Sequence, residues 1–280
     1  MLLVENQTFD EERALYGASE TEVKNVRFEG PADGESALKE TRNIRVHDSY
    51  FALRYPMWHS SMFTMENCEM TDTCRAALWY DFQGGINNCR LHGIKALREC
   101  FSIIISDSDI DSAEFGWQCE KVAIDSSKIN SEYAFLHSKK LSLDNVTFSG
   151  KYSFQYVEDV IIRDSVLDTK DAFWHSKNVT CENCTIKGEY LGWYSENLIL
   201  RNCKIIGTQP LCYARELLLD NCTMEGCDLA FEYSDVEAKV NSTIDSVKNP
   251  LSGRISADGY GEIITEGSLF KSECEILVNQ

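Results

Sequence analysis

The chain has 280 residues, a formal net charge of −18 at pH 7 and 12 cysteines. Such an excess of acidic residues disfavours nucleic acid and anionic membranes as partners. The first residues lack a basic segment followed by an apolar stretch, and no run of 18 apolar residues occurs, so the sequence predicts neither a signal peptide nor a membrane span.

A short phrase recurs eleven times along the chain, and its last seven steps are each 19 residues long. The copies begin at Glu20, Asn43, Met62, Gln83, Ser102, Lys121, Lys140, Asp159, Asn178, Asn197 and Glu216. Within each copy, positions 2 and 4 are apolar and alternate with polar residues, as in Ile103 and Ile105, and position 9 is apolar throughout. The alternation predicts a strand with one buried face, and the fixed period predicts a solenoid.

Position 6 of the repeat is nearly always Asn or Asp, and it is Ser once. Its members are Asn25, Asp48, Asn67, Asn88, Asp107, Ser126, Asn145, Asp164, Asn183, Asn202 and Asn221. Asn and Asp tolerate left-handed backbone angles, so one such residue makes a sharp bend between two short strands. In stacked units we expect the side-chain amides to hydrogen-bond one another as an asparagine ladder.

A unit of 19 residues is too short for a strand, a crossover helix and a return strand, but it accommodates three short strands. We therefore predict a right-handed parallel β-helix of about 12 rungs rather than a leucine-rich repeat, which needs several Leu in every unit. The prediction is one domain over residues 1–280. It has an N-terminal cap (1–19), regular rungs (20–234), and degenerate rungs with a C-terminal cap (235–280). The Gly84-Gly85 pair is predicted to be a turn.

Five cysteines share position 7 of the repeat, which suits a small buried side chain. They are Cys68, Cys89, Cys184, Cys203 and Cys222. Neighbours in such a column would lie close to bonding distance, so free thiols in a reducing compartment are the natural interpretation. Cys181 and Cys184 have no second pair in the sequence, so we predict no metal site, and no phosphate-binding or dinucleotide-binding motif predicts a cofactor.

Positions 13–17 are predicted to form the third strand, and all five Trp of the chain fall on position 16 when the insertion after Met62 is allowed for. Position 17 is rich in His and Tyr. Because neighbours in a strand face opposite ways, either position 16 faces solvent or positions 15 and 17 do. Arg98 and Gln155 in column 16 would be costly to bury, which favours the first arrangement. That arrangement places the His and Tyr side chains of position 17 inside, where they need hydrogen-bond partners, and this favours the second.

In either arrangement one face carries aromatic rings interspersed with polar side chains. This combination is typical of carbohydrate-binding sites, where the C–H faces of a sugar stack on the rings and its hydroxyls bond the polar groups. The candidate ligand-binding residues are Trp58, Trp79, Trp117, Trp174, Trp193, His59, Tyr80, His137, Tyr156 and Tyr194. The candidate catalytic residues are Asp81, Arg98, Glu99, Asp171 and His175, with Arg75 and Lys95 nearby. Glycoside hydrolysis needs two carboxyl groups ~5–9.5 Å apart, and neighbouring rungs would bring Asp81 and Glu99 into that range. Each of these charged residues also fits a solvated or paired surface position.

Several longer phrases resemble an uncharacterised bacterial domain of unknown function that is grouped with the pectate-lyase-like β-helices. They are Glu12–Gly17, Asp33–Glu40, Leu53–His59, Cys74–Tyr80, Gly93–Glu99, Asp171–Lys177 and Gly188–Tyr194. The resemblance implies a right-handed parallel β-helix and a bacterial, cytoplasmic setting, and it implies no activity. The chain lacks the Asp cluster that true pectate lyases use for calcium, which weighs against lyase chemistry.

Two functions are therefore compared. The first is binding or processing of a neutral or weakly charged oligosaccharide along the aromatic face, since the net charge of −18 weighs against a polyanionic glycan. An enzyme of this kind would be a polysaccharide lyase or a glycoside hydrolase. The second is a non-enzymatic scaffold, or a homo-oligomer, that uses the aromatic face as a protein interface.

Overall fold

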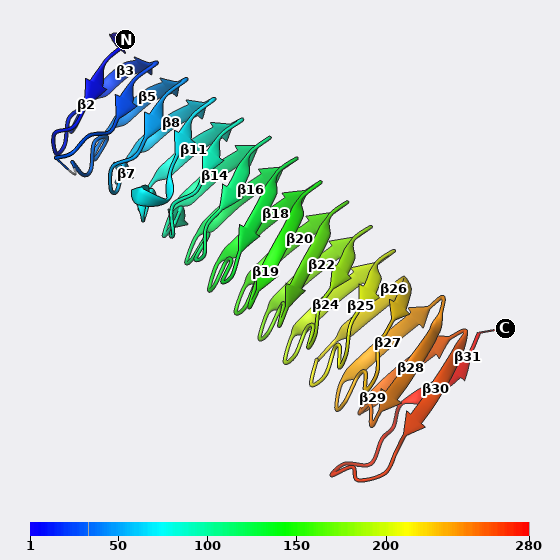
Figure 1. Ribbon diagram of the computed structural model, residues 1–280. Helices are drawn as coiled ribbons and strands as arrows, with labels where there is room; N and C mark the ends of the chain where they lie inside the picture. The colour runs from blue at the N-terminus through cyan, green and yellow to red at the C-terminus, as the bar shows by residue number, and fades with distance from the viewer. Residues whose placement is uncertain (33, 280) are drawn as a thin grey trace. The chain divides into compact units, whose positions relative to one another are not determined.

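The computed structural model describes residues 1–32 and 34–279, and these fold as two compact units, Met1–Ser142 and Leu143–Gln280. Within each unit the chain coils so that strands of one turn pair in parallel with strands of the next (Figure 1). The prediction of a right-handed parallel β-helix is confirmed, and the chain makes about 15 turns. No helix in the described part of the chain is long and apolar enough to cross a membrane.

The longest strands of the first unit form one parallel sheet. They are β1 (Leu2–Glu5), β3 (Ser19–Lys24), β5 (Arg42–His47), β8 (Ser61–Glu66), β11 (Phe82–Asn87), β14 (Phe101–Ser106) and β16 (Glu120–Asp125). Repeat positions pair with themselves, since Ile103 lies opposite Val122 and Ile105 opposite Ile124. All four of these side chains are buried, so the period-two pattern marks the inner face correctly.

A second set of short strands follows the position 6 bend in the first unit. It consists of β2 (Thr8–Phe9), β4 (Arg27–Phe28), β6 (Tyr50–Phe51), β9 (Glu69–Met70), β12 (Arg90–Leu91), β15 (Asp109–Asp111) and β17 (Lys128–Ser131). A third set is shorter: β7 (Met57–Trp58), β10 (Leu78–Trp79) and β13 (Leu97–Arg98). One 3₁₀ turn, η1 (Asp72–Cys74), lies between β9 and β10.

The second unit repeats this plan after β18 (Lys139–Asp144), which spans the boundary residue. Its long strands are β20 (Glu158–Arg163), β22 (Lys177–Glu182), β24 (Glu196–Arg201), β26 (Leu217–Glu225), β27 (Asp235–Val240), β29 (Ser252–Ala257) and β31 (Glu275–Val278). Its other strands are β19 (Thr147–Lys151), β21 (Val166–Lys170), β23 (Thr185–Lys187), β25 (Lys204–Ile206), β28 (Thr243–Lys248) and β30 (Gly259–Ile264). The third segment of each regular coil in this unit is not a strand but a turn with three left-handed residues, such as Asp171, Phe173 and His175.

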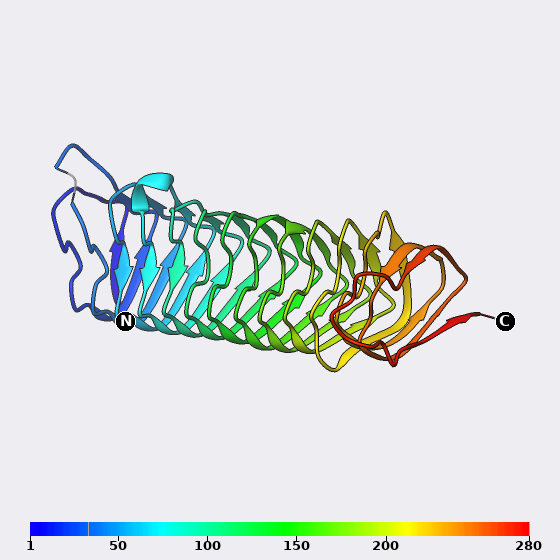
Figure 2. The same ribbon diagram turned by 90° about the horizontal axis from the view of Figure 1, so that it is seen from below.

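The number of turns exceeds the predicted 12 because both ends contribute turns of their own. Residues 1–19, predicted as a cap, already form a turn in register, with Leu2 opposite Thr21 and Val4 opposite Val23. Beyond residue 235, β27 pairs with β26, β29 with β27 and β31 with β29. The orange and red segments of Figures 1 and 2 show these last turns, which keep the strand pairing although the sequence phrase has faded.

Side-chain amides at the position 6 bend hydrogen-bond from turn to turn. In the first unit Asn67 donates to Asp48 at 3.1 Å and Asn88 donates to Asn67 at 2.7 Å. In the second unit Asn183 donates to Asp164 at 2.9 Å and Asn202 donates to Asn183 at 3.1 Å. Every one of these residues has a positive φ near 50°, which is why Asn and Asp suit the position.

The Gly84-Gly85 pair is not a turn, so that prediction is wrong. Both glycines lie inside β11, where Gly84 pairs with Phe63 of β8. A Cβ on Gly84 would lie 2.1 Å from the Phe63 ring. The glycine therefore makes room for a large neighbour in the core and does not bend the chain.

Candidate functional site

Positions 16 and 17 both face outward, except for the buried Cys212 at position 16, while positions 15 and 18 face the interior. Around β10, Leu78 and Asp81 are buried, whereas Trp79 is half-buried and Tyr80 is 41% exposed. Tyr80 has φ of 59°, and a left-handed residue interrupts the strand alternation that placed neighbours on opposite sides. The prediction that the two positions face opposite ways is therefore wrong. Both aromatic columns are on the outside.

The tryptophan column is the set of outward residues at position 16, and in the first unit it is a pile of rings and cations. The indole rings of Trp58 and Trp79 are stacked with centroids 5.2 Å apart. The Arg98 guanidinium lies 5.8 Å from the Trp79 ring and 5.3 Å from that of Trp117, and the Lys39 ammonium lies 4.1 Å from Trp58. These contacts are cation–π pairs. They cover the ring faces, so the column presents mainly ring edges to solvent.

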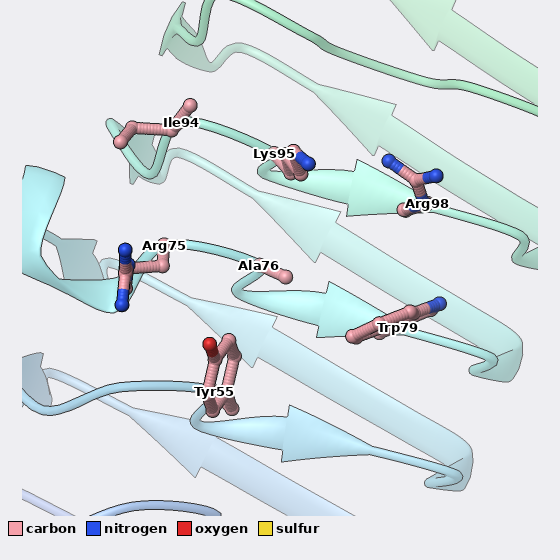
Figure 3. A pocket seen from close by; sticks show the side chains of 7 residues that line it. All are labelled: Tyr55, Arg75, Ala76, Trp79, Ile94, Lys95 and Arg98. Atoms are coloured by element: carbon pink, nitrogen blue, oxygen red, sulfur yellow. The ribbon is translucent and has the colours of Figure 1, made fainter.

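A pocket of about 400 Å³ opens beside this column in the first unit (Figure 3). Its lining residues are Tyr55, Arg75, Ala76, Trp79, Ile94, Lys95 and Arg98. Figure 3 shows that Trp79 and Arg98 come from the successive strands β10 and β13. Tyr55 comes from the bend before β7, Arg75 from the bend before β10, and Ile94 and Lys95 from the segment before β13. Aromatic and aliphatic walls with a few convergent polar groups are typical of small-molecule sites.

Two carboxylates partly balance the cations of this pocket. Glu99 lies 3.4 Å from Arg98 and also accepts a hydrogen bond from the Trp79 indole N–H at 3.3 Å. Glu114 lies 3.3 Å from Lys95 and 3.7 Å from Arg98. Glu99 also hydrogen-bonds the Tyr80 hydroxyl, and this bond raises the pKa of Tyr80. The two carboxylates thus pair with Lys95 and Arg98 but leave Arg75, the third cation of the pocket, without an ion pair among the described residues.

The second unit carries its own aromatic columns. Trp174 and Trp193 are stacked with centroids 5.4 Å apart, and each indole N–H donates to a backbone carbonyl, of Tyr190 at 2.7 Å and of Gln209 at 2.8 Å. The tyrosine–histidine column at position 17 is a continuous pile in which Tyr156, His175, Tyr194 and Tyr213 stack at 4.9–5.0 Å. The rings follow the turn spacing of ~4.8 Å, so they stack face to face.

A second pocket, of about 410 Å³, lies beside the tryptophan column of the second unit. It is lined by Tyr152, Lys170, Asp171, Trp174, Tyr190, Trp193 and Gln209. Burial raises the pKa of the Asp171 carboxyl, the nearby Lys170 ammonium lowers it, and Glu189 raises it. Lys170 is paired with Glu189 at 3.1 Å. This pocket therefore has more aromatic wall and less free positive charge than the pocket of the first unit.

The structure separates the predicted catalytic residues. Asp81 is buried and accepts a hydrogen bond from the Ser60 backbone N–H at 2.7 Å, while its other oxygen has no hydrogen-bond partner. Burial raises the pKa of Asp81 well above its ordinary value of 3.8. Glu99 faces outward beside Arg98, so the expected Asp81–Glu99 pair does not share a surface. His175 lies between the rings of Tyr156 and Tyr194.

Of the predicted ligand-binding residues, Trp79 lines the first pocket, and Trp174 and Trp193 line the second. Trp58 and Trp117 belong to the tryptophan column of the first unit. His59, Tyr80 and His137 are exposed at position 17 in the first unit, and Tyr156 and Tyr194 are exposed at position 17 in the second.

The predicted set included Asp171 of the bend that precedes the tryptophan column, and Arg75 only as a neighbour of the catalytic candidates, but it lacked the other residues of this bend. Tyr55 and Arg75 in the first unit, and Tyr152, Tyr190 and Gln209 in the second, all have positive φ and all line a pocket. Position 13 of the repeat would have revealed most of them, because it is rich in Tyr and charged residues. The insertion after Met62 shifts Arg75 out of that column in the sequence.

The profile of the family described as "Protein of unknown function (DUF3737)" matches residues 2–277. The chain belongs to this family. No curated protein matches the chain.

Several solved structures are similar at low identity. PfbA, a surface adhesin of Streptococcus pneumoniae, is 9% identical over 83% of this chain and 74% of its own, with a TM-score of 0.42. A family 6 polysaccharide lyase specific for mannuronic acid, from human gut microbiota, is 8% identical over 94% and 83%, with a TM-score of 0.42. The tailspike of Escherichia coli bacteriophage HK620, solved with a hexasaccharide, is 8% identical over 92% and 59%, with a TM-score of 0.46.

Proposed function

We propose that the chain is a carbohydrate-binding protein whose ligand lies against the tryptophan columns. The observation that carries the proposal is the recurrence of one arrangement in both units. Each unit has a pocket of about 400 Å³ between the outward residue at position 16 and the bend before it, walled by Trp and Tyr. Sugars combine apolar C–H faces with hydroxyl groups, and both pockets combine aromatic walls with hydrogen-bonding side chains.

The ring stacking shapes how a sugar would bind. Because Trp58 covers one face of Trp79 and Trp193 covers one face of Trp174, a sugar does not lie flat along the column. It enters the pockets instead, where Tyr55 and Ile94 in the first unit, or Tyr152 and Tyr190 in the second, add apolar surface. Binding is proposed and not turnover, since Asp81 is buried and Glu99 is engaged by Arg98 and Trp79.

Tryptophan fluorescence tests the proposal directly, because all five Trp belong to the tryptophan columns. The chain is titrated with a panel of neutral and acidic oligosaccharides, and calorimetry confirms any change. We expect at least one ligand with Kd below about 1 mM, and weaker binding after Trp79→Ala or Trp193→Ala. Phe82→Ala is the matched control, since Phe82 is 43% exposed on β11 and lines neither pocket. The proposal fails if no sugar of the panel binds.

A protein interface is the second candidate, and the exposed pile of Tyr and His rings in the second unit favours it. Tyr156 and Tyr194 are 46% and 47% exposed, and Tyr is enriched in protein interfaces. Light scattering at micromolar concentration separates the two functions. A homo-oligomer that dissociates after Tyr194→Ser would support this candidate, and a monomer that binds sugar would exclude self-association as the main role.

We further propose that the chain works in a reducing compartment such as the cytoplasm. The support is the column of thiols at position 7, in which Cys203 hydrogen-bonds Cys184 on one side and Cys222 on the other within the second unit. Thiols so close would be oxidised readily outside a reducing environment. Mass spectrometry of protein alkylated in its native host is the test, and recovery of disulfides among these three residues would contradict it.

A further inference from the structure

The first pocket lies beside an insertion that interrupts the regular phrase between strands β9 and β10. The step from Met62 to Gln83 is 21 residues long, two more than the regular step, and the insertion falls where the chain forms η1 and the left-handed Arg75 that follows it. Trp79 donates to the Glu99 carboxylate, but at four later copies the outward side chain at position 16 donates to the backbone carbonyl of the residue 16 positions later. Trp117, Gln155, Trp174 and Trp193 all do so. Trp58, one turn before the insertion, does not.

Two buried hydrogen-bond donors beside this pocket lack partners. The Trp58 indole nitrogen Nε1 and the Arg98 guanidinium nitrogen Nη1 are both buried, and neither has a hydrogen-bond partner among the described residues. The Glu114 carboxylate lies 3.7 Å from Arg98 Nη1, which is beyond hydrogen-bond range. A buried polar group without a partner costs free energy. Arg98 lines the pocket, and Trp58 stacks on Trp79 of its wall.

The charged residues of the pocket also indicate an anionic ligand. Arg75, Lys95 and Arg98 line it, and Glu99 and Glu114 are the carboxylates that contact them. Arg75 is exposed and has no ion pair in the part of the chain that the structure describes. A chain with a net charge of −18 thus keeps a locally positive pocket. Arg is the residue whose planar donors match a carboxylate, sulfate or phosphate group.

We infer that the first pocket binds an oxyanion carried by a sugar, and this inference rests on the proposed carbohydrate-binding function. Arg75 and Arg98 hold the oxyanion, while Tyr55, Trp79 and Ile94 contact the sugar ring. The pocket of the second unit does not share this specificity. It has Asp171 at the bend, and Glu189 already neutralises Lys170.

The test compares ligands that differ in charge, in the kind of oxyanion or in the presence of a sugar ring. Calorimetry measures binding of an oligo-uronic acid trisaccharide, of its methyl ester, of a sulfated neutral trisaccharide, and of acetate and inorganic sulfate. We expect the acid or the sulfate-bearing sugar to bind at least about tenfold more tightly than the ester, as the loss of a charge-assisted hydrogen bond predicts. Arg75→Gln and Arg98→Gln should each remove about tenfold of that preference.

Arg90→Gln is the matched control, because Arg90 lies on β12 outside the pocket and its loss should leave the preference unchanged. Arg75 is exposed, so its variant tests the inference even if Arg98→Gln fails to fold. An ester that binds as tightly as the acid would overturn the inference and leave the carbohydrate proposal standing. Acetate or sulfate alone binding as tightly as the acidic sugars would overturn the role of the sugar ring. Failure of every sugar would overturn both proposals.

Discussion

The indole ring of Trp58 lies on that of Trp79 with centroids 5.2 Å apart and planes 9° apart. Met57 pairs with Leu78 in the strands beneath, so this geometry follows from strand register and not from chance contact. A parallel coil places equivalent side chains of successive turns one strand spacing apart. That spacing is close to the distance between the centroids of two stacked rings. Aromatic columns in this protein therefore stabilise the coil as well as lining its pockets.

Removal of either ring should remove most of the stacking energy. We expect Trp58→Ala and Trp79→Ala to be non-additive, with a coupling of about 0.5–1.5 kcal/mol in the free energy of unfolding. A double-mutant cycle by urea denaturation measures it. Additive effects within experimental error would mean that the rings merely lie close.

Replacement of Asp81 should stabilise the protein at neutral pH. The folded-state pKa of Asp81 is raised above 3.8 by burial, so the folded state binds a proton more tightly than the unfolded state. The contribution of this group to stability is therefore fully present below about pH 4 and is lost as the pH rises through the folded-state value. Asp81→Asn, which keeps an acceptor for the Ser60 N–H, should raise Tm at pH 7 and change it little at pH 4.

Asp125→Asn, an exposed replacement on β16, is the control for the loss of one negative charge. The result that contradicts the Asp81 prediction is equal stabilisation by both variants at pH 7. Thermal melts followed by circular dichroism at the two pH values are sufficient to tell these outcomes apart.

Loss of a bend amide should cost more than its hydrogen bonds alone. Asn183 donates to Asp164, accepts from Asn202 and has φ of 56°. We expect Asn183→Ala to lower the free energy of unfolding by about 2–3 kcal/mol, from two hydrogen bonds and about 1 kcal/mol of left-handed strain. Asn183→Gly removes the bonds without the strain, so it should cost less than the alanine variant. A loss of unfolding free energy that is as large for Asn183→Gly as for Asn183→Ala, or larger, would show that left-handed strain does not contribute.

Gly188 is expected to tolerate no side chain. Its φ is 150°, and a Cβ would lie 2.2 Å from the Thr169 carbonyl oxygen of the preceding turn. Gly188→Ala should lower the free energy of unfolding by about 2–4 kcal/mol. Gly226→Ala is the control, because φ there is 63° and a Cβ would meet nothing within 4 Å. Urea denaturation that shows equal losses for the two variants would contradict the steric account.

Sequence alone located the inner face of the coil. Val122 and Ile124 were predicted to be buried from the alternation of apolar residues, and both are. The bend at position 6 was also evident, because Asn and Asp are the residues that tolerate its backbone angle. The bends at positions 1, 13 and 17 were not, since Lys121, Tyr190 and Tyr194 adopt positive φ without any preference for it. Stacking on neighbouring turns imposes those angles.

The residues that line the pockets could likewise be predicted only in part from the sequence. Trp79 and Arg98 were candidates because they share a repeat position, but Tyr55 and Arg75 join them through a bend that the sequence did not reveal. The direction of Asp81 was equally hidden, because the left-handed Tyr80 before it turns the carboxyl into the core.

The repeated phrase by itself determined that this chain coils, how long each turn is and which residues fill the interior, because those properties depend on local periodicity and on the burial of apolar side chains. Tertiary structure alone decided which outward side chains meet across turns, which donors stay unpaired at the insertion and where the pockets open. Those outcomes depend on backbone angles that neighbouring turns impose on residues with no preference of their own.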